Sequence, residues 1–544
     1  MRIRRPRSPI NAISAARTST RTLAASTIYV IAATLASTIL GFGREIVNAG
    51  FFGTRWELDT FLAAATIPTI LFGVFNGALV NALLPVFSEY LTLGDREGAY
   101  RLSSTVFNIL LIGLSMLVVL GWIGAPMYVP MIAHGFPAPQ MGVAIRMTRL
   151  LLPSIVATSL AGVVSAVLNA EQRFTASALQ GVAVNIVTMA TVFLLYARFG
   201  IYALVFGTTL GFFAQLAVQL PSLIIRRSYR FVLDLAHPGL NRVWSMLGPV
   251  VVGSAAGQIA LFFDRFFAST LSPGYIAGMN YATKLVGFPQ QVFAAAIATV
   301  IFPLLASQFA ASNRSGIRRS VSMGLRLVNL IAIPSVCGLT VLSYPIVQTL
   351  FERGAFDERA TALCASLLPF AAIGLVALAA NVVLTRCCFA CKETRLTVVI
   401  SVGTVVLNVA LSLLWLKPLG AAGLLLANSV SQSVQMVFLL VLVWRLVQGM
   451  DARALFASAW RIALASLVMV ASLHWINALG VHPEETLVSR TWYLFGQLAI
   501  GALVFIAVAR GLGVEEIDVT KRLLLEKFER RIISPPENRE GPIA

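Results

Sequence analysis

The sequence predicts an all-α polytopic membrane protein with about 14 transmembrane helices. Three observations lead to this fold class: 58% of the 544 residues are hydrophobic, only 12% are charged, and the hydrophobic residues collect in segments long enough to cross a bilayer. A soluble domain has about 25% charged residues. The composition therefore excludes disordered, fibrous and disulfide-rich secreted proteins and leaves no residues for a sizeable soluble domain.

Apolar segments bounded by charged residues, Gly or Pro give the expected helices. About 20 apolar residues cross a bilayer, and each segment is near or above that length. In chain order the predicted helices cover residues 25–50, 59–90, 104–132, 143–169, 174–197, 201–225, 243–271, 276–310, 319–351, 359–385, 395–416, 419–446, 459–478 and 490–512. Prolines within many of these helices each remove one backbone hydrogen bond and permit a bend.

An internal repeat divides the predicted helices into two groups. The segment Gly77–Ser88 resembles Ala295–Ala306. The offset between them covers six predicted helices, an even number, so the two copies have the same orientation in the membrane. The sequence therefore predicts two parallel six-helix lobes with the transport pathway between them, followed by two more helices: an N-lobe over 25–227, a C-lobe over 243–446 and the final pair over 459–512.

Both ends of the chain are expected to lie in the cytoplasm. If residues 1–24 form a basic cytoplasmic arm, segments on that side hold 28 Lys and Arg residues and the opposite loops hold seven, as the positive-inside rule requires. An even number of spans returns the C-terminus to the same side. Within residues 513–544 we expect an amphipathic helix at 514–532 on the anionic inner leaflet, followed by a disordered tail.

The net charge of +18 does not indicate nucleic-acid binding, because most of the 41 Lys and Arg residues lie in these loops and termini. None of the five Lys follows a Gly, so the phosphate-binding loop of an ATP-driven pump is absent. Cys388 and Cys391 form a single C-x-x-C without a second pair or a nearby His, which favours reduced thiols. We expect no metal and no cofactor. The acidic and His residues of the outer loops are scattered, which favours a transporter over an enzyme.

Charged side chains inside the spans identify the candidate site, because each costs about 2.5–3.5 kcal/mol to insert. They lie in the first, seventh and eighth predicted helices and are Arg44 and Glu45, Asp264 and Arg265, and Lys284, respectively. Arg44 and Asp264 are separated by the repeat offset, so each lobe carries an acid and a base at the same place. We expect a polar cavity between the lobes in which Arg44, Arg265 and Lys284 bind an anionic headgroup.

The acidic residues of this cavity are expected to tune or gate it. Glu45 and Asp264 would set its charge balance, and Asp59, which opens the second predicted helix, would act with them. Alternatively, the charged residues are structural ion pairs or snorkel to the interface, and Asp59 is only an N-cap. Neighbouring residues on a helix diverge by about 100°. We therefore expect no ion pair within either dyad of adjacent residues, Arg44-Glu45 or Asp264-Arg265. Arg149 and Arg326, near helix ends, are expected to snorkel.

Three stretches of the sequence carry a family resemblance: GFGREIVNAGFFGTRWELDTFLAAATIPTIL, GALVNALLPVFSEY and NYATKLVGFPQQVFAAAIATVIFPLLA. They look like the MurJ/MviN family of flippases in the multidrug/oligosaccharidyl-lipid/polysaccharide exporter superfamily. The resemblance extends over nearly the whole chain and implies two six-helix lobes plus two helices. It also implies translocation of lipid II, the undecaprenyl-diphosphate-linked peptidoglycan precursor, from the inner to the outer leaflet by alternating access. The driving force would be the membrane potential or an ion gradient.

The resemblance also implies roles for individual residues. Arg44 and Asp59 match the family motif, Glu45 stands where an acid is usual, and Lys284 stands where arginine is common. The chain departs from the family at five positions that are often charged, namely Thr38, Phe72, Gly73, Gly77 and Thr283.

These observations favour a flippase in the bacterial inner membrane that moves lipid II or a related lipid-linked oligosaccharide. The Asp264-Arg265 dyad resembles polysaccharide-repeat flippases, so an exopolysaccharide repeat-unit flippase is an alternative. A cation-coupled small-molecule antiporter is the alternative from another class. The expected partners are the undecaprenyl-diphosphate-linked glycan, anionic lipids and proteins of cell-envelope synthesis, and the chain is expected to be a monomer.

Overall fold

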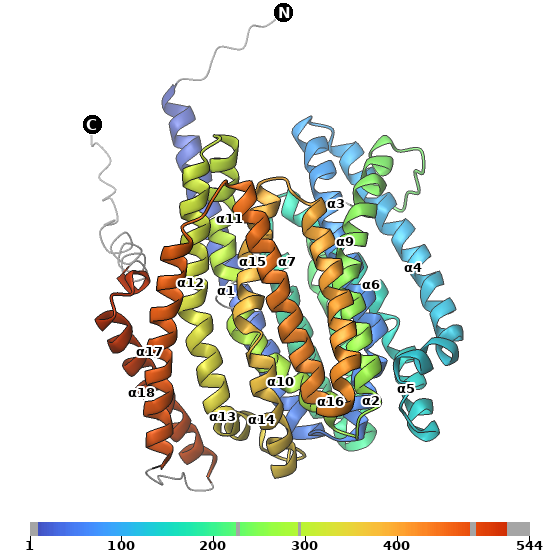
Figure 1. Ribbon diagram of the computed structural model, residues 1–544. Coiled ribbons are helices and arrows are strands. Elements are labelled where there is room, and N and C mark those ends of the chain that lie inside the picture. Colours follow the sequence, from blue (N-terminus) through green and yellow to red (C-terminus); the bar gives the residue numbers. More distant parts are fainter. Residues whose placement is uncertain (1–8, 225–228, 292–294, 479–485, 519–544) are drawn as a thin grey trace, which may run out of the picture. The chain divides into compact units, whose positions relative to one another are not determined.

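The structure, a computed structural model, describes residues 9–224, 229–291, 295–478 and 486–518. These residues form α-helices and no strand, which confirms the all-α prediction (Figure 1). The helices of the first part of the chain are α1 (Pro9–Phe52), α2 (Trp56–Ala64), α3 (Thr66–Thr92), α4 (Arg96–Ile132), α5 (Ala138–Leu151), α6 (Ser154–Ala170), α7 (Phe174–Phe199), α8 (Tyr202–Ile224), α9 (Pro238–Ala268) and α10 (Tyr275–Pro289).

The second part of the described chain continues the same pattern. Its helices are α11 (Ala295–Ala310), α12 (Arg314–Val341), α13 (Ser343–Phe351), α14 (Glu358–Ala372), α15 (Leu375–Ala390), α16 (Arg395–Leu446), α17 (Ala452–Ala478) and α18 (Leu487–Gly511). Within the described ranges, nine helical stretches are long and apolar enough to cross a membrane, and the pair α14 and α15, bent by 44°, makes a tenth.

Helix α16 contains two of the predicted spans. At 1.5 Å per residue its 52 residues would extend about 78 Å, far beyond a hydrocarbon core of about 30 Å. The helix is interrupted at Gly420, where φ is 57°, a conformation that glycine adopts without strain. This break falls next to the predicted boundary between the helices at 395–416 and 419–446. Five predicted helices are each divided into two in the structure: 59–90 into α2 and α3, 143–169 into α5 and α6, 276–310 into α10 and α11, 319–351 into α12 and α13, and 359–385 into α14 and α15. The ends of the other predicted helices agree to within several residues, although α1 begins at Pro9 and so extends into the expected N-terminal arm.

The chain divides into two compact units. The first comprises residues up to Lys284 together with Phe351–Cys364 and Ser401–Ala427. In it, α3 packs against α6 and α9, and α7 packs against α1 and α8. One apolar cluster of this unit includes the fully buried Phe87, Leu102 and Leu168 and therefore packs α3, α4 and α6 together.

The second unit comprises Leu285–Leu350, Ala365–Ile400 and the chain from Asn428 onward. Its central helix is α12, which packs against α11, α15 and α17, while α18 packs on α17. Asn477 of α17 accepts hydrogen bonds from Tyr493 and Gln497 of α18, and these polar contacts join the last two helices. The amphipathic helix predicted at 514–532 lies largely outside the described residues.

Two arginines expected to snorkel have specific partners instead. Arg326 of α12 pairs with Glu515 at 3.0 Å and with the buried Glu516, both beyond the end of α18. Arg149 of α5 lies 4.4 Å above the ring of Trp122 and donates a hydrogen bond to the Trp122 carbonyl at 2.9 Å. Nearby acceptors satisfy these guanidinium groups, so they do not need to reach the membrane surface.

Candidate functional site

The first cluster of the site lies on α1 and α10. Arg44 Nη2 contacts Glu45 Oε1 at 3.0 Å, so the expectation that adjacent residues would not pair was wrong for this dyad. The long arginine side chain folds back along the helix and overcomes the divergence of the two Cα–Cβ bonds. Asn48, one turn further along α1, also hydrogen bonds to the Glu45 carboxylate, and Lys284 of α10 lies close enough to interact with it electrostatically.

Exposure distinguishes the cations of this cluster from its carboxylate. The Glu45 side chain is 10% exposed, whereas that of Arg44 is 26% exposed and Lys284 belongs to the exposed residues. Two cations around one carboxylate leave a net positive charge. A buried acid therefore holds two cations together, and both remain within reach of an anionic ligand.

A second cluster forms around Asp59 at the start of α10. The Asp59 carboxylate accepts the backbone N–H of Gly274 and, at 2.7 Å, that of Ala277. Asp59 lies in the first turn of α2, whose N-cap residue is Arg55, so the alternative that it caps its own helix was wrong. It caps α10, satisfying N–H groups that have no partner within that helix. The positive charge of Arg265, in α9, also interacts electrostatically with the Asp59 carboxylate.

The dyad on α9 divides between two environments. Arg265 contacts the Ile276 carbonyl and Asn280 Oδ1 of α10, both at 3.5 Å. Asp264 interacts electrostatically with its neighbour Arg265, but its buried Oδ1 has no hydrogen-bond partner among the described residues. A buried acceptor without a donor is costly, which makes Asp264 the strained member of the site.

Tyr281 connects the two clusters. It is fully buried and interacts electrostatically with Glu45 and Asp59, and its hydroxyl donates to the Gly53 carbonyl at 3.4 Å. Its ring lies 5.0 Å from that of Phe351 and 5.4 Å from that of Phe356. These contacts fix α10, and hence Lys284 one turn later, against the turn between α1 and α2.

A close backbone contact, here called the interlock, completes the arrangement. It joins residues 50–54, the end of α1 and the turn after it, to residues 353–356, the turn after α13. Ala355 N donates to the Gly50 carbonyl at 2.8 Å. Gly53 and Gly354 have φ of 58° and 59°, and a Cβ atom at either would overlap the backbone of the other turn. Only glycine allows the two turns to approach this closely.

The structure brings the six predicted site residues together within the first unit, in two clusters connected by α10. Glu45 joins Arg44 and Lys284 in the first, and Asp59, Arg265 and Asp264 lie in or beside the second. Tyr281 and the interlock were not predicted from the sequence. Glycines at 50, 53 and 354, close to aromatic residues, were the available signal.

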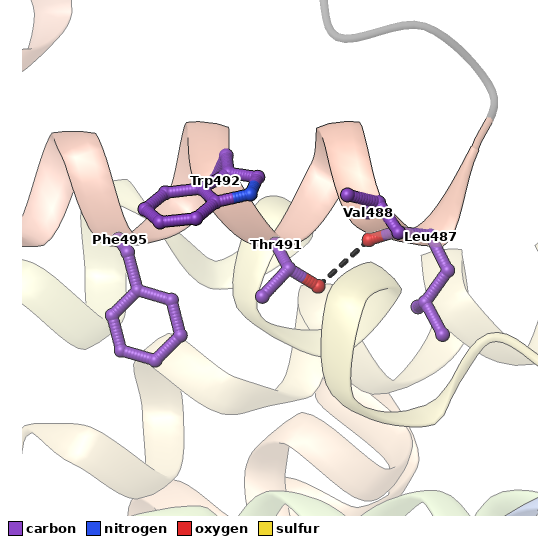
Figure 2. A pocket seen from close by; sticks show the side chains of 5 residues that line it. All are labelled: Leu487, Val488, Thr491, Trp492 and Phe495. Carbon is purple, nitrogen blue, oxygen red and sulfur yellow. Dashed lines mark hydrogen bonds between the residues drawn. The ribbon is translucent and has the colours of Figure 1, made fainter.

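No group of three or more His, Cys, Asp or Glu side chains that could hold a metal ion occurs in the described part of the chain. A hollow of about 350 Å³ lies on α18 in the second unit (Figure 2). Figure 2 shows its lining of Leu487, Val488, Thr491, Trp492 and Phe495, with the Thr491 hydroxyl bonded to its own helix. The predicted site residues do not line it, and its apolar walls suit hydrocarbon rather than a charged headgroup.

Comparison with known proteins gives consistent matches. The family model described as "Lipid II flippase MurJ" matches residues 48–496. A probable lipid II flippase MurJ of Vibrio cholerae is 28% identical over 92% of this chain and 98% of its own length. The lipid II flippase MurJ of Burkholderia cenocepacia is 27% identical over 81% and 88%, respectively.

Two solved structures show the same fold. A lipid II flippase MurJ in an inward closed conformation has a TM-score of 0.76 at 23% identity and covers 93% of this chain and 100% of its own. An inward-facing multidrug resistance MATE transporter has a TM-score of 0.69 at 14% identity, with coverages of 76% and 94%. At these identities the likeness concerns the fold alone.

Proposed function

The chain belongs to the lipid II flippase MurJ family, and we propose that it moves lipid II from the inner to the outer leaflet of the bacterial inner membrane by alternating access. The family match over residues 48–496 carries this proposal and confirms the predicted family. It also makes the chain a member of a transporter family with a lipid-linked substrate. The arrangement of charges in the first unit suits the diphosphate of such a substrate.

Diphosphate binding is assigned to Arg44 and Lys284, with Arg265 as a third cation. In a membrane-embedded site a charge-assisted hydrogen bond to phosphate is stronger than in water, and a planar guanidinium can contact two oxygens. Glu45 keeps Arg44 and Lys284 close together while no substrate is bound. In the empty site the Glu45 carboxylate therefore balances these cations. When the diphosphate enters, its oxygens replace that carboxylate as the partners of Arg44 and Lys284.

The interlock is assigned to the closed outer end of the pathway. If the N-terminus is cytoplasmic, α1 ends at the outer surface, and the turn after it lies there too. Asp59 capping α10, Gly50 bonded to Ala355 and Tyr281 bonded to Gly53 all join the first repeat half to the second at this end. Release of the headgroup to the outer leaflet would require these contacts to separate.

We propose that both termini are cytoplasmic, and the distribution of Lys and Arg supports this orientation. The basic residues on that side would contact anionic lipids. We also propose that the chain acts as a monomer with proteins of cell-envelope synthesis as its partners. Asp59 and Asp264 would tune or gate the site together with Glu45.

Complementation of a lipid II flippase depletion tests the proposal. We expect the full chain to restore growth, with Lys284→Arg retaining activity and Arg44→Ala and Lys284→Ala losing it at equal expression. An exopolysaccharide repeat-unit flippase would restore polysaccharide export but not growth. A cation-coupled antiporter would confer drug resistance that is independent of Arg44 and Lys284. Either result without restored growth would contradict the proposal.

A further inference from the structure

The connector between α8 and α9 has extensive polar contacts with the side of α4. Residues 229–237, here called the strap, contain no helix or strand and end at His237, the N-cap residue of α9. Resting on the proposed function, we propose that the strap stays docked on α4 throughout transport and positions α9, and that Asn108 is the positioning residue that holds it.

Asn108 makes the central contact of the strap. It lies in α4, is 1% exposed, and has partners for both ends of its amide. Its Nδ2 donates to the Val232 carbonyl at 3.0 Å, and its Oδ1 accepts the Tyr229 hydroxyl at 2.7 Å. The ring of Tyr229 also packs edge-on against Phe107 at 5.3 Å. A buried asparagine in an apolar helix is expensive unless such partners are present, so this residue specifies a docked strap.

Two more buried side chains of α4 bind the strap backbone. Ser104 Oγ accepts the N–H of Arg230 at 3.2 Å, and Thr105 Oγ1 accepts the N–H of Asp234 at 3.2 Å. Ser104 and Thr105 are 2% and 0% exposed. Together with Asn108 they form one face of α4, at positions i, i+1 and i+4, and they satisfy backbone groups of a segment that has no regular structure of its own.

Ion pairs surround this buried face. Arg101 contacts Asp234 at 2.9 Å and Arg230 contacts Glu97 at 3.1 Å, but the Arg230 and Glu97 side chains are 69% and 79% exposed. Such exposed pairs contribute little to stability. The buried hydrogen bonds, rather than the ion pairs, therefore determine whether the strap is docked.

The end of the strap fixes the start of α9. His237 Nδ1 accepts the N–H of Gly239 at 3.1 Å and caps the helix, while the His237 ring lies 5.4 Å from that of Tyr90 in α3. Arg242 in the first turns of α9 makes a bidentate contact with Glu89 of α3, at 2.8 and 3.0 Å. Helix α9 also packs against α3 and α4.

This arrangement has a consequence for the site. Asp264 and Arg265 lie near the other end of α9. Because α9 is anchored to α3 and α4, these two residues move together with α3 and α4. Displacements of about 1 Å at a binding site change rates by orders of magnitude. A docked strap therefore keeps Asp264 and Arg265 at a fixed position relative to the rest of the first unit.

A disulfide across the strap tests whether it stays docked. Ser104→Cys exchanges one atom, and the hydroxyl oxygen already lies 3.2 Å from the backbone nitrogen of Arg230. In a full-length variant with the five native cysteines replaced and parental transport retained, Ser104→Cys/Arg230→Cys should cross-link readily. Transport of fluorescent lipid II in proteoliposomes should then be the same after oxidation and after reduction, to within about twofold. Failure to cross-link, or loss of transport on oxidation alone, would overturn the proposal.

A rescue experiment separates positioning from a general structural role. Asn108→Leu should lower the maximal transport rate by about tenfold or more. The same substitution in the oxidised cysteine pair should transport at the rate of the parent, because the disulfide replaces the lost anchor. Arg230→Ala, which removes only an exposed ion pair, is the matched control and should change little. If Asn108→Leu transports normally, or if its loss persists after oxidation, Asn108 does not position α9. Parental activity of the cysteine-free chain shows that the proposed function itself holds.

Discussion

Asp59 and Gly274 are 215 residues apart in sequence, yet the buried carboxylate of Asp59 accepts the backbone N–H of Gly274 and caps α10. The contact connects α2 to α10, the helix that carries Tyr281 and Lys284. It therefore ties the position of a candidate substrate-binding cation to a residue of a different helix.

Replacing this carboxylate should impair both folding and transport. Asp59→Ala leaves two N–H groups of α10 without an acceptor and should cost about 1–2 kcal/mol of stability. Asp59→Asn keeps one acceptor oxygen and should lie between Ala and the parent. Thermal unfolding in detergent measures the order of the three proteins. Equal stabilities of all three would show that the cap is unimportant.

The cations around Glu45 should affect binding of the headgroup. Lys284→Ala removes one charge-assisted contact with the diphosphate, worth about 1.5–3 kcal/mol, and so should weaken lipid II binding by about 10- to 100-fold. Lys284→Arg, which keeps the charge, should bind like the parent. Titration of purified protein with lipid II distinguishes them. Equal affinity of the Ala variant would remove Lys284 from the site.

Glycine at position 354 should be required for the interlock. Its φ is 59°, and a Cβ atom there would overlap the Gly50 carbonyl, so Gly354→Ala should destabilise the protein by more than about 1 kcal/mol. Gly338→Ala is the matched control, because Gly338 lies inside α12 with open space where its Cβ would be. That change should be neutral or stabilise the helix by about 0.5–1 kcal/mol. Similar unfolding midpoints for the two variants would contradict the close approach.

Arg326 should be important for stability in the second unit. Its side chain is 17% exposed and pairs with Glu516, which is 1% exposed and also accepts a hydrogen bond from Ser458. Arg326→Ala leaves a buried carboxylate without its cation and should cost about 3 kcal/mol. Glu515→Gln, at a side chain that is 75% exposed, should cost little. If the two variants unfold alike, Glu516 does not depend on Arg326.

The apolar segments were predictable from the sequence, although five of them are each divided into two helices. Hydropathy identifies membrane-spanning segments because the hydrocarbon core of the bilayer favours apolar side chains over the whole length of a span. The cost of inserting charge singled out Arg44, Glu45 and Lys284, which indeed lie together. The break at Gly420 was also predictable, since Gly follows Pro and Leu between two apolar segments.

Contacts between distant segments were not predictable in this way. The bond between Ala355 and Gly50 involves only backbone atoms, so no side-chain pattern marks it. Glu516, the partner of Arg326, is 190 residues away, and reading Arg326 alone suggested a snorkelling side chain. Ser104, Thr105 and Asn108 resemble ordinary small polar residues of a membrane helix until the strap that they bind is seen.

Alternating access, as proposed here, requires the interlock to open, and a reversible cross-link tests this requirement most directly. The position of a Cβ atom on Gly50 lies 3.3 Å from Arg353 Cγ, so Gly50→Cys/Arg353→Cys is placed to form a disulfide. In the cysteine-free full chain, oxidation should stop lipid II transport in proteoliposomes and a reductant should restore it, while each single variant transports in both conditions. If fully cross-linked protein transports lipid II as fast as the protein treated with reductant, the interlock does not need to open.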